Sequence, residues 1–203
     1  MRELADHILD LTRNAVEAGA SEVLLTVAED LSSDRLEISI ADNGRGRDAA
    51  TVAQVTDAFF TTRHTRRQGL GLPRFAATCQ RCGGDLKIDS APGHGTTVRG
   101  WMQASHLDRP PLGDLGAVVQ ALALETGLGH WRYEQRVGER RFVVDSAEMR
   151  REARGERREG ETAGSDGGVQ APALQPETAL QPGDLVRLRE MVNEKARELA
   201  DGT

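Results

Sequence analysis

The sequence is poor in aromatic residues and in cysteine. Phe, Trp and Tyr make up 3% of the 203 residues, so a core must be built mainly from Leu, Val, Ile and Ala. The two cysteines, Cys79 and Cys82, exclude a disulfide-rich scaffold and suit a reducing compartment. They form one Cys-x-x-Cys segment without a second cysteine pair or a histidine at zinc-finger spacing. We therefore interpret them as structural thiols rather than as a redox pair or half of a metal site.

The sequence also lacks a positive net charge and a long hydrophobic run. The formal net charge is -6 at pH 7, so global electrostatics give no reason to expect binding to DNA or RNA. The apolar stretches fall short of a membrane span, and the charged N-terminus MRELADHILD is unlike a signal peptide. We expect a cytoplasmic protein with no nucleic acid and no membrane among its partners.

Hydrophobic periodicity predicts an α+β fold for the first half of the chain. Apolar residues recur at helical spacing over residues 3–18, and Gly19 suits the left-handed position that ends a helix. Residues 22–28 and 35–41 have the pattern of a β-hairpin. Further elements are predicted in this order: a short helix from Asp48, a helix over residues 72–84, and a hairpin of residues 85–90 and 96–104. This order favours a two-layer α/β sandwich, with helices on one face of a sheet.

The second half of the chain predicts three further segments. Residues 105–149 form a small helix-hairpin extension to the first domain, which we place at residues 1–104. Residues 150–183 are rich in Gly, Glu, Arg, Ala and Pro, which is typical of a disordered linker. Residues 184–203 form an amphipathic tail helix. That helix suits docking to a protein partner, self-association as a homodimer, or packing on its own domain, and the sequence leaves these alternatives open.

The predicted first helix carries a polar stripe. Asp10, Asn14 and Glu17 are spaced four and three residues apart, so they share one face, and His7 extends that face. A stripe of this kind is typical of a solvated surface. The alternative is a face for a metal-bound nucleotide, because a carboxylate can hold a water and an amide oxygen is a hard ligand suited to Mg²⁺.

Two glycine-containing segments extend this alternative. The motif DNGRG, residues 42–46, follows a predicted strand, where a carboxylate can accept a hydrogen bond from a purine amino group. Glycines after it let a flat ring approach the backbone. The segment FFTTRHTRRQGLGLP, residues 59–73, places a basic loop before glycines that open a helix. Backbone N–H groups at a helix start form an anion site, and such an arrangement suits a triphosphate.

Taken together and in order, these segments resemble the nucleotide-binding boxes of the GHKL superfamily of gyrases, chaperones, histidine kinases and mismatch-repair ATPases, which share the Bergerat fold. DLTRNAVEAGAS resembles the N box, and DNGRG resembles the first glycine box. FFTTRHTRRQGLGLP resembles the Phe-Phe-Thr-Thr-Lys and Gly-Leu-Gly-Leu segments of nitrogen-regulatory histidine kinases, and GHGTTVRGW resembles the final Gly-Thr box. The resemblance covers about residues 1–104.

The resemblance implies a role for each matching residue. Asn14 would bind Mg²⁺, Asp42 would bind the adenine amino group with Thr96 beside it through a water, and Asp10 would be the catalytic carboxylate. The remaining nucleotide contacts would come from glycines at the base and the phosphates and from a basic lid: Gly44, Gly46, Gly69, Leu70, Gly71, Arg63, His64, Arg66 and Arg67. The implied ligands are ATP and Mg²⁺.

Departures from the family pattern predict slow or partner-dependent turnover. Asp10 stands where the ATPases usually have Glu, Arg67 replaces a glycine of the fuller kinase pattern, and the lid is short. The sequence begins at the N box without a phosphoacceptor helix, so we do not expect a self-contained histidine kinase. Segments such as SHLDRPPLGDLG also resemble small stand-alone ATP-binding proteins encoded beside iron-only hydrogenase genes in anaerobic bacteria.

The predicted function is an ATP- and Mg²⁺-binding module that hydrolyses ATP slowly or uses nucleotide to regulate an unidentified protein partner. Two alternatives remain at this point. One is an anti-sigma-type serine protein kinase, in which Asp10 would act as base toward a hydroxyl rather than a water. The other is a non-catalytic adaptor that binds ATP for structure alone.

Overall fold

The computed structural model describes residues 3–56, 71–153 and 182–201. These residues form six helices and six strands, and α5 is the only one of them that the sequence pattern did not predict. In chain order they are α1 (Leu4–Glu17), β1 (Glu22–Asp30), β2 (Arg35–Asp42), α2 (Ala49–Thr56), α3 (Gly71–Arg81), β3 (Asp85–Ser90), β4 (Thr96–Gln103), α4 (Leu115–Leu124), β5 (His130–Val137), β6 (Arg140–Asp145), α5 (Ser146–Ala153) and α6 (Pro182–Asp201).

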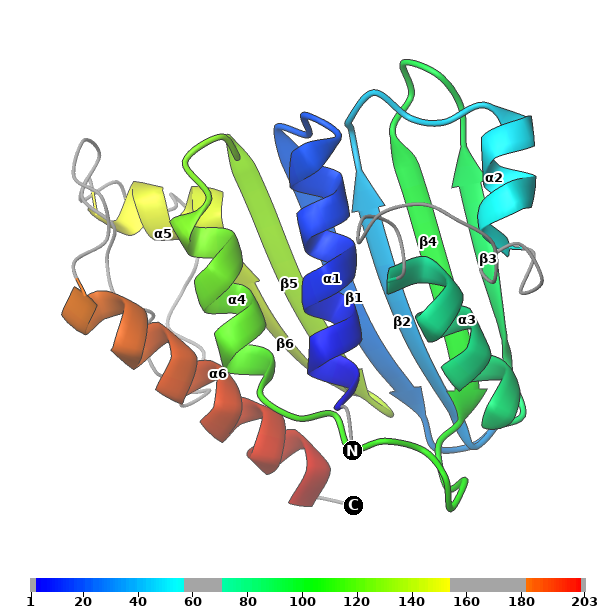
Figure 1. The fold of residues 1–203 in the computed structure, drawn as a ribbon. Coiled ribbons are helices and arrows are strands. Elements are labelled where there is room, and N and C mark those ends of the chain that lie inside the picture. Colours follow the sequence, from blue (N-terminus) through cyan, green and yellow to red (C-terminus); the bar gives the residue numbers. More distant parts are fainter. Residues whose placement is uncertain (1–2, 57–70, 154–181, 202–203) are drawn as a thin grey trace.

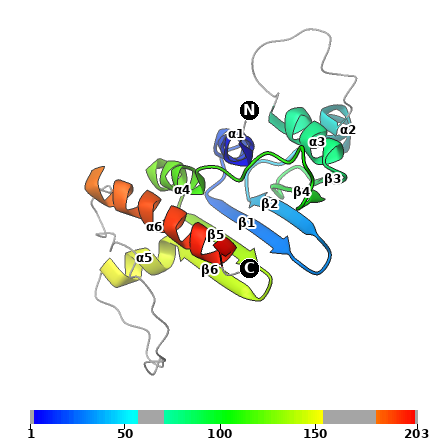
Figure 2. The same ribbon diagram turned by 90° about the horizontal axis from the view of Figure 1, so that it is seen from below.

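All six strands belong to one mixed sheet. Their order is β3-β4-β2-β1-β5-β6, with β1 and β5 parallel and the other neighbours antiparallel. Helices α1, α3 and α4 lie on the same face of this sheet (Figures 1 and 2). The predicted α+β class with two layers is therefore confirmed, and the late hairpin β5–β6 continues the same sheet.

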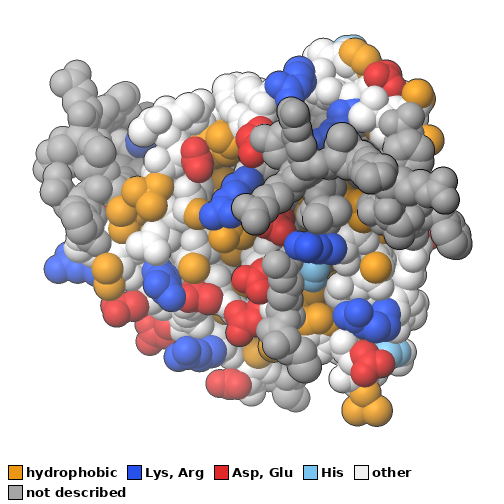
Figure 3. All heavy atoms as spheres, in the orientation of Figure 1, with side chains coloured by type: hydrophobic (Ala, Val, Ile, Leu, Met, Phe, Trp, Pro, Cys, Tyr) orange, Lys and Arg blue, Asp and Glu red, His pale blue; other side chains and the backbone are white. Residues whose placement is uncertain are grey.

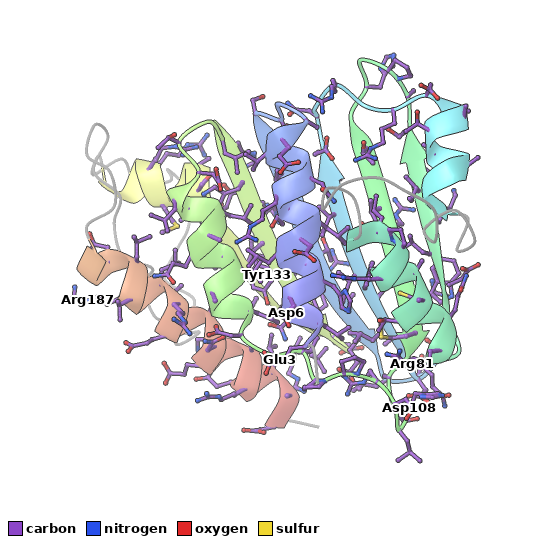
Figure 4. The ribbon with its side chains drawn as sticks, viewed as in Figure 1. Glu3, Asp6, Arg81, Asp108, Tyr133 and Arg187 are labelled. Carbon is purple, nitrogen blue, oxygen red and sulfur yellow. The ribbon has the colours of Figure 1, made fainter. Side chains whose placement is uncertain are left out.

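The start of α1 is fixed by reciprocal hydrogen bonds. Glu3 and Asp6 form a capping box, in which each side chain accepts from the backbone of the other residue; Figure 4 shows both at the start of the helix. Four apolar residues of its inner stripe are almost fully buried: Leu4, Ile8, Leu11 and Ala15. The helix ends before Gly19, whose φ of 75° is the left-handed conformation predicted there.

The placement of His7 on the polar stripe of this helix is wrong. The side chain is only 4% exposed, and its ring centroid lies 5.7 Å from that of Phe75 on α3. Nε2 of His7 lies 3.4 Å from the hydroxyl of Thr78, also on α3. Helical spacing alone puts His7 near the polar face, but packing of α3 against α1 covers it.

The core lies between the sheet and its helices. Alternate residues of β2 point into it, as predicted: Leu36, Ile38 and Ile40 are at most 3% exposed. On β4 the same face includes Gly100, where an added Cβ would lie 2.4 Å from the Phe75 ring. The glycine thus lets α3 pack close to the sheet, so that one of the few aromatic residues is fully enclosed.

The tail helix α6 packs on its own chain. It contacts α4 and the outer strands β5 and β6, and its apolar residues Leu188 and Val192 are fully buried. Figure 2 shows α6 beside α4. Of the three alternatives for this helix, the structure therefore shows packing within the chain.

The structure also bears on the two cysteines and on the length of the apolar segments. Cys79 and Cys82 are free and fully buried, and burial together with the neighbouring Cys82 raises the pKa of the Cys79 thiol to about 12. A thiol of this kind stays protonated and unreactive at neutral pH. Among the described helices, none is long and apolar enough to cross a membrane.

Candidate functional site

A cleft opens where β2 and β4 meet the loops at one end of the sheet. Its volume is about 480 Å³. In Figure 1 this is the upper end, where the connection from β2 to α2 passes the turn between β3 and β4. Polar and glycine residues on its wall include Asn14, Asp42, Arg45, Gly46, Arg47, Asp48, Thr51 and Thr96; apolar ones include Leu11, Ala15, Ile40, Leu72 and Val98.

Asp42, the last residue of β2, is the half-buried carboxylate of this cleft. Its Oδ1 accepts a hydrogen bond of 2.8 Å from the backbone N–H of Gly44. Burial raises the pKa of the Asp42 carboxyl above its ordinary value of 3.8, and the backbone N–H groups of Gly44 and Thr96 and the charge of Arg47 oppose that rise. The carboxylate is thus held in place by the backbone while it lines an open space.

Two turns cross beside Asp42, and each crossing requires a glycine. A Cβ on Gly46 would lie 1.9 Å from the carbonyl oxygen of Ala91, and a Cβ on Gly95 would lie 1.9 Å from that of Asp42. Both glycines have positive φ, 67° and 76° respectively. Since other residues adopt this conformation only at a cost, the chain needs glycine here for two reasons. The close contact fixes the loop after β2 against the turn that precedes β4.

Ser90 lies at the centre of this crossing. Its hydroxyl accepts a hydrogen bond of 2.9 Å from the backbone N–H of Arg47 and donates one of 2.9 Å to the carbonyl of Gly95. It also lies 3.0 Å from the hydroxyl of Thr96. One side chain therefore joins both loops to a residue on the cleft wall.

Asn43 anchors the same loop to the neighbouring strand β1. Its Oδ1 accepts hydrogen bonds of 2.9 Å from the backbone N–H groups of Ser21 and Glu22, and its Nδ2 donates to the Ser21 hydroxyl. These bonds fix the loop to the start of β1. The residue next to Asp42 is thus structural, which leaves Asp42 as the one of the pair that lines the cleft.

The start of α3 meets α1 at the edge of the cleft. Gly71 is buried there, and an added Cβ would lie 3.1 Å from Cβ of Asp10 and 3.7 Å from Nδ2 of Asn14. Asn14 and Leu72 line the cleft. The amide oxygen of Asn14 and the carboxylate of Asp10 are hard oxygen donors of the kind that Mg²⁺ takes. Among the described residues, no group of three His, Cys, Asp or Glu side chains could hold a metal by itself.

The structure thus brings together part of the set predicted from sequence. Asn14, Asp42, Gly46 and Thr96 share the cleft. Gly44 lies behind Asp42, against Ala18 of the α1 cap, and Asp10 and Gly71 lie side by side at its edge. The other predicted residues lie outside the described part of the chain: Arg63, His64, Arg66, Arg67, Gly69 and Leu70.

Sequence reasoning missed several residues around the cleft, among them Arg45, Arg47 and Ser90. Arg45 and Arg47 alternate with the glycines of DNGRGR, so their place in this motif could have identified them as site residues. Ser90 precedes the turn APGHG, where the pattern indicates only a hairpin, and Gly95 lies in GHGTTVRGW, which resembles the final Gly-Thr box but for which no role was predicted. Their contacts with residues 42–47 join segments far apart in sequence, and local periodicity carries no information on such contacts.

Charges on the helical face of the molecule are mixed. Figure 3 shows acidic and basic side chains interspersed over the described part of this face. The described part of this face therefore carries no single basic patch (Figure 3).

Comparison with known families matches residues 2–106 to the family model described as "Histidine kinase-, DNA gyrase B-, and HSP90-like ATPase". The matched region contains all the cleft residues named above. A solved structure, the crystal structure of the N-terminal domain of a DNA repair protein, aligns with a TM-score of 0.51 and 13% identity over 71% of this chain and 52% of that one. At this identity the likeness shows the fold alone.

Several curated relatives are named as sensor kinases. The chain is 40% identical over 93 residues to the sensor protein kinase FleS of Pseudomonas aeruginosa. This aligned stretch covers 46% of this chain and 23% of that protein. It is 34% identical over 89 residues to the sensor histidine kinase ZraS of Klebsiella oxytoca, covering 43% of this chain and 19% of that protein. The chain thus spans less than a quarter of the length of these two relatives.

Proposed function

Because the chain belongs to the family of histidine kinase-, DNA gyrase B- and HSP90-like ATPases, we propose that its cleft binds ATP with Mg²⁺ and that nucleotide turnover there is slow or serves to regulate a protein partner. The observation that carries this proposal is Asp42, a half-buried carboxylate fixed by backbone hydrogen bonds on the wall of a cleft of about 480 Å³. A concave site of this size, lined by both polar and apolar side chains, suits a small molecule.

The base would lie at the Asp42 end of the cleft. The ionised carboxylate accepts hydrogen bonds only, so it suits the amino group of adenine. Ile40 and Val98 supply an apolar wall for a flat ring. Gly46 also lines this space. These features support a purine rather than a sugar or a peptide.

The phosphates and the metal would lie toward the start of α3. N–H groups of the first turn of a helix bind anions, and Gly71 and Leu72 begin α3 beside Asn14. Asn14 and Asp10 would hold Mg²⁺ and a water with their oxygens. When bound, Mg²⁺ withdraws electron density from the phosphoryl oxygens and neutralises their charge.

Asp10 would act as general base toward the attacking group. It lies on α1 against Gly71, at the edge of the cleft and half-buried. Its side chain is one methylene shorter than the Glu found in most of the family's ATPases, which supports slow turnover in the isolated protein. A partner hydroxyl delivered to Asp10 would be a second substrate for the same base.

A second candidate function is phosphoryl transfer to a protein partner. The similarity to FleS and ZraS, both named as sensor kinases, favours it. In this case the γ-phosphoryl group would pass to a side chain of the partner, and this chain would supply nucleotide binding and the base.

Three measurements on the purified protein separate the functions. Steady phosphate release that Asp10→Asn abolishes supports the ATPase. Transfer of radiolabel from ATP to a partner, also abolished by Asp10→Asn, supports the kinase. Tight Mg²⁺-dependent binding with neither reaction supports regulation by binding alone. If ATP does not bind at all, the proposed function is wrong.

A further inference from the structure

We propose that Ser90 is a positioning residue that fixes the hydroxyl of Thr96 as a hydrogen-bond acceptor, so that the cleft selects purines with a 6-amino group over purines with a 6-oxo group. The inference rests on the proposed function, because it concerns the base bound at the same site. It adds a specificity determinant that does not itself line the cleft.

The argument begins with the hydrogen bonds of the Ser90 hydroxyl. A hydroxyl has one proton to donate and two lone pairs that accept. The backbone N–H of Arg47 can only donate, so it takes one lone pair of Ser90. The carbonyl of Gly95 can only accept, so it takes the proton of Ser90. One lone pair of the Ser90 oxygen then remains.

The remaining neighbour, Thr96, must therefore be the donor. Its Oγ1 lies 3.0 Å from the Ser90 oxygen, within hydrogen-bond distance. With the Ser90 proton engaged by Gly95, this contact is favourable only if Thr96 donates its own proton. The hydroxyl of Thr96, which lines the cleft, is then left with lone pairs alone for a ligand.

This arrangement makes acceptors of Asp42 and Thr96, two of the polar side chains on the cleft wall. Asp42 accepts because it is ionised, and Thr96 accepts because Ser90 holds its proton. A 6-amino purine offers hydrogen-bond donors at this position, whereas a 6-oxo purine offers an acceptor. The oxo group would face two acceptors, and a buried polar group left without a partner is costly.

Removal of the Ser90 hydroxyl would release the Thr96 proton. Thr96 could then donate to a 6-oxo group, while the N–H next to that group donates to Asp42. The substitution Ser90→Ala is therefore expected to change which base binds. A merely structural role, in which Ser90 only joins the two loops through Arg47 and Gly95, would instead weaken the binding of every nucleotide by a similar factor.

The test is calorimetric titration with ADP and IDP, which differ at this position of the purine. Wild type is compared with Ser90→Ala, Thr96→Val and the double variant. Ser90→Thr keeps the hydroxyl, and Ser105→Ala removes a serine hydroxyl that bonds to Asp34, outside the cleft. In wild type we expect ADP to bind at least about tenfold more tightly than IDP, as one unmatched polar contact would produce.

The expected result is a loss of about fivefold in this preference in Ser90→Ala, the size of one neutral hydrogen bond. The preference should persist in Ser90→Thr and Ser105→Ala. In the Thr96→Val background, Ser90→Ala should cause no further loss, because the two residues act through one contact.

Two results would overturn the inference while the proposed function stands. One is an equal weakening of ADP and IDP in Ser90→Ala, and the other is an undiminished effect of Ser90→Ala in the Thr96→Val background. A wild-type protein that binds neither nucleotide would instead overturn the proposed function.

Discussion

In two regions of the same sheet, the polar side chains differ in what they contact. At the cleft, Asp42 and Thr96 are fixed by the backbone or by Ser90 and then line an open space. On the outer strands β5 and β6, charged side chains are matched to one another. Glu134 is 7% exposed and forms ion pairs with three arginines: Arg132, Arg136 and Arg141.

In the contact between α4 and α6, as on the outer strands, polar side chains are matched to one another. Asp114, the N-cap of α4, accepts hydrogen bonds from Arg189 and from Nδ2 of Asn193 on α6. Oδ1 of Asn193 accepts from the backbone N–H of Gly116 at 2.9 Å. A Cβ on Gly116 would lie 2.2 Å from the carbonyl of Arg189, so the helices touch through this glycine.

This difference in partners indicates which polar groups are available to a ligand. A polar group that has protein partners on every side contributes to the fold, as in the contact of Asp114 with α6. A polar group that is fixed from behind and faces a cavity is arranged for something outside the chain. The account therefore predicts that substitutions in the two regions have separable effects on binding and on stability.

The largest expected effect comes from Asp42→Asn. We expect the affinity for ADP to fall about 100-fold or more, because a charged acceptor is lost and a donor is turned toward the base. Burial raises the pKa of Asp42, which means that the folded state favours the protonated carboxyl over the ionised one. This group therefore contributes less to stability at pH 7 than at low pH. A neutral amide should therefore leave the fold intact, as circular dichroism would show. Asp89→Asn, an exposed residue of β3, is the matched control, and equal losses in both variants would contradict the placement of the base.

The next effect concerns the crossing turns. We expect Gly46→Ala to lower the free energy of unfolding by about 3 kcal/mol or more, since it combines a positive φ with a collision against Ala91. Gly93→Ala is the control, because Gly93 has a φ of 77° but open space around its Cβ, and it should cost only about 1 kcal/mol. Denaturant titration measures both. Similar losses would mean that the crossing is not tight.

A smaller effect should separate the tail helix from the cleft. We expect Asn193→Ala to lower the free energy of unfolding by about 1–2 kcal/mol, because Gly116 N–H loses its acceptor and Asp114 loses a donor. ADP affinity should stay unchanged. Glu194→Ala, an exposed residue on α6, is the control for helix propensity. A change in ADP affinity without a change in stability would contradict the assignment of Asn193 to the fold rather than to the cleft.

The smallest effect is a pH dependence on the outer strands. Nδ1 of His130 lies 2.8 Å from Glu22, and Nε2 lies 3.0 Å from Asp145. Partial burial lowers the pKa of His130, but the bonds to both carboxylates outweigh it and raise the pKa above 6.5. The stabilisation is fully present below pH 6.5 and is lost as pH rises through the folded-state pKa.

We therefore expect His130→Gln to abolish a difference in unfolding free energy of less than about 1 kcal/mol between pH 6 and pH 8. His94→Gln, an exposed histidine, should preserve it. The measurement is denaturant titration at both pH values. If the two variants behave alike, the bridge to Glu22 and Asp145 does not contribute to stability.

Local patterns predicted most of the fold near the cleft. The alternation in β2, the helical stripe of α1 and the glycine after α1 each reflect short-range geometry, so the elements described within residues 3–56 and 71–104 could be predicted from the sequence. The placement of His7 failed because packing of a second helix decides it. The helix α5 was missed because its polar sequence has no clear apolar stripe, and its second half overlaps the linker predicted from residue 150.

Contacts between distant segments could not be predicted. The parallel pairing of β5 with β1 joins residues about a hundred positions apart, and no local period specifies it. Similarly, the place of α6 depends on Gly116 and Asn193, which are separated by 77 positions. At the cleft, the same limit hid Ser90, whose partner Arg47 is 43 positions away.

The most direct test of the central claim is calorimetric titration of the purified protein with ADP and with a non-hydrolysable ATP analogue, each with and without Mg²⁺. The account predicts Mg²⁺-dependent binding of one nucleotide per chain, lost in Asp42→Asn and kept in Asp89→Asn. Absence of saturable binding in the wild type, or equal binding by Asp42→Asn, would contradict it.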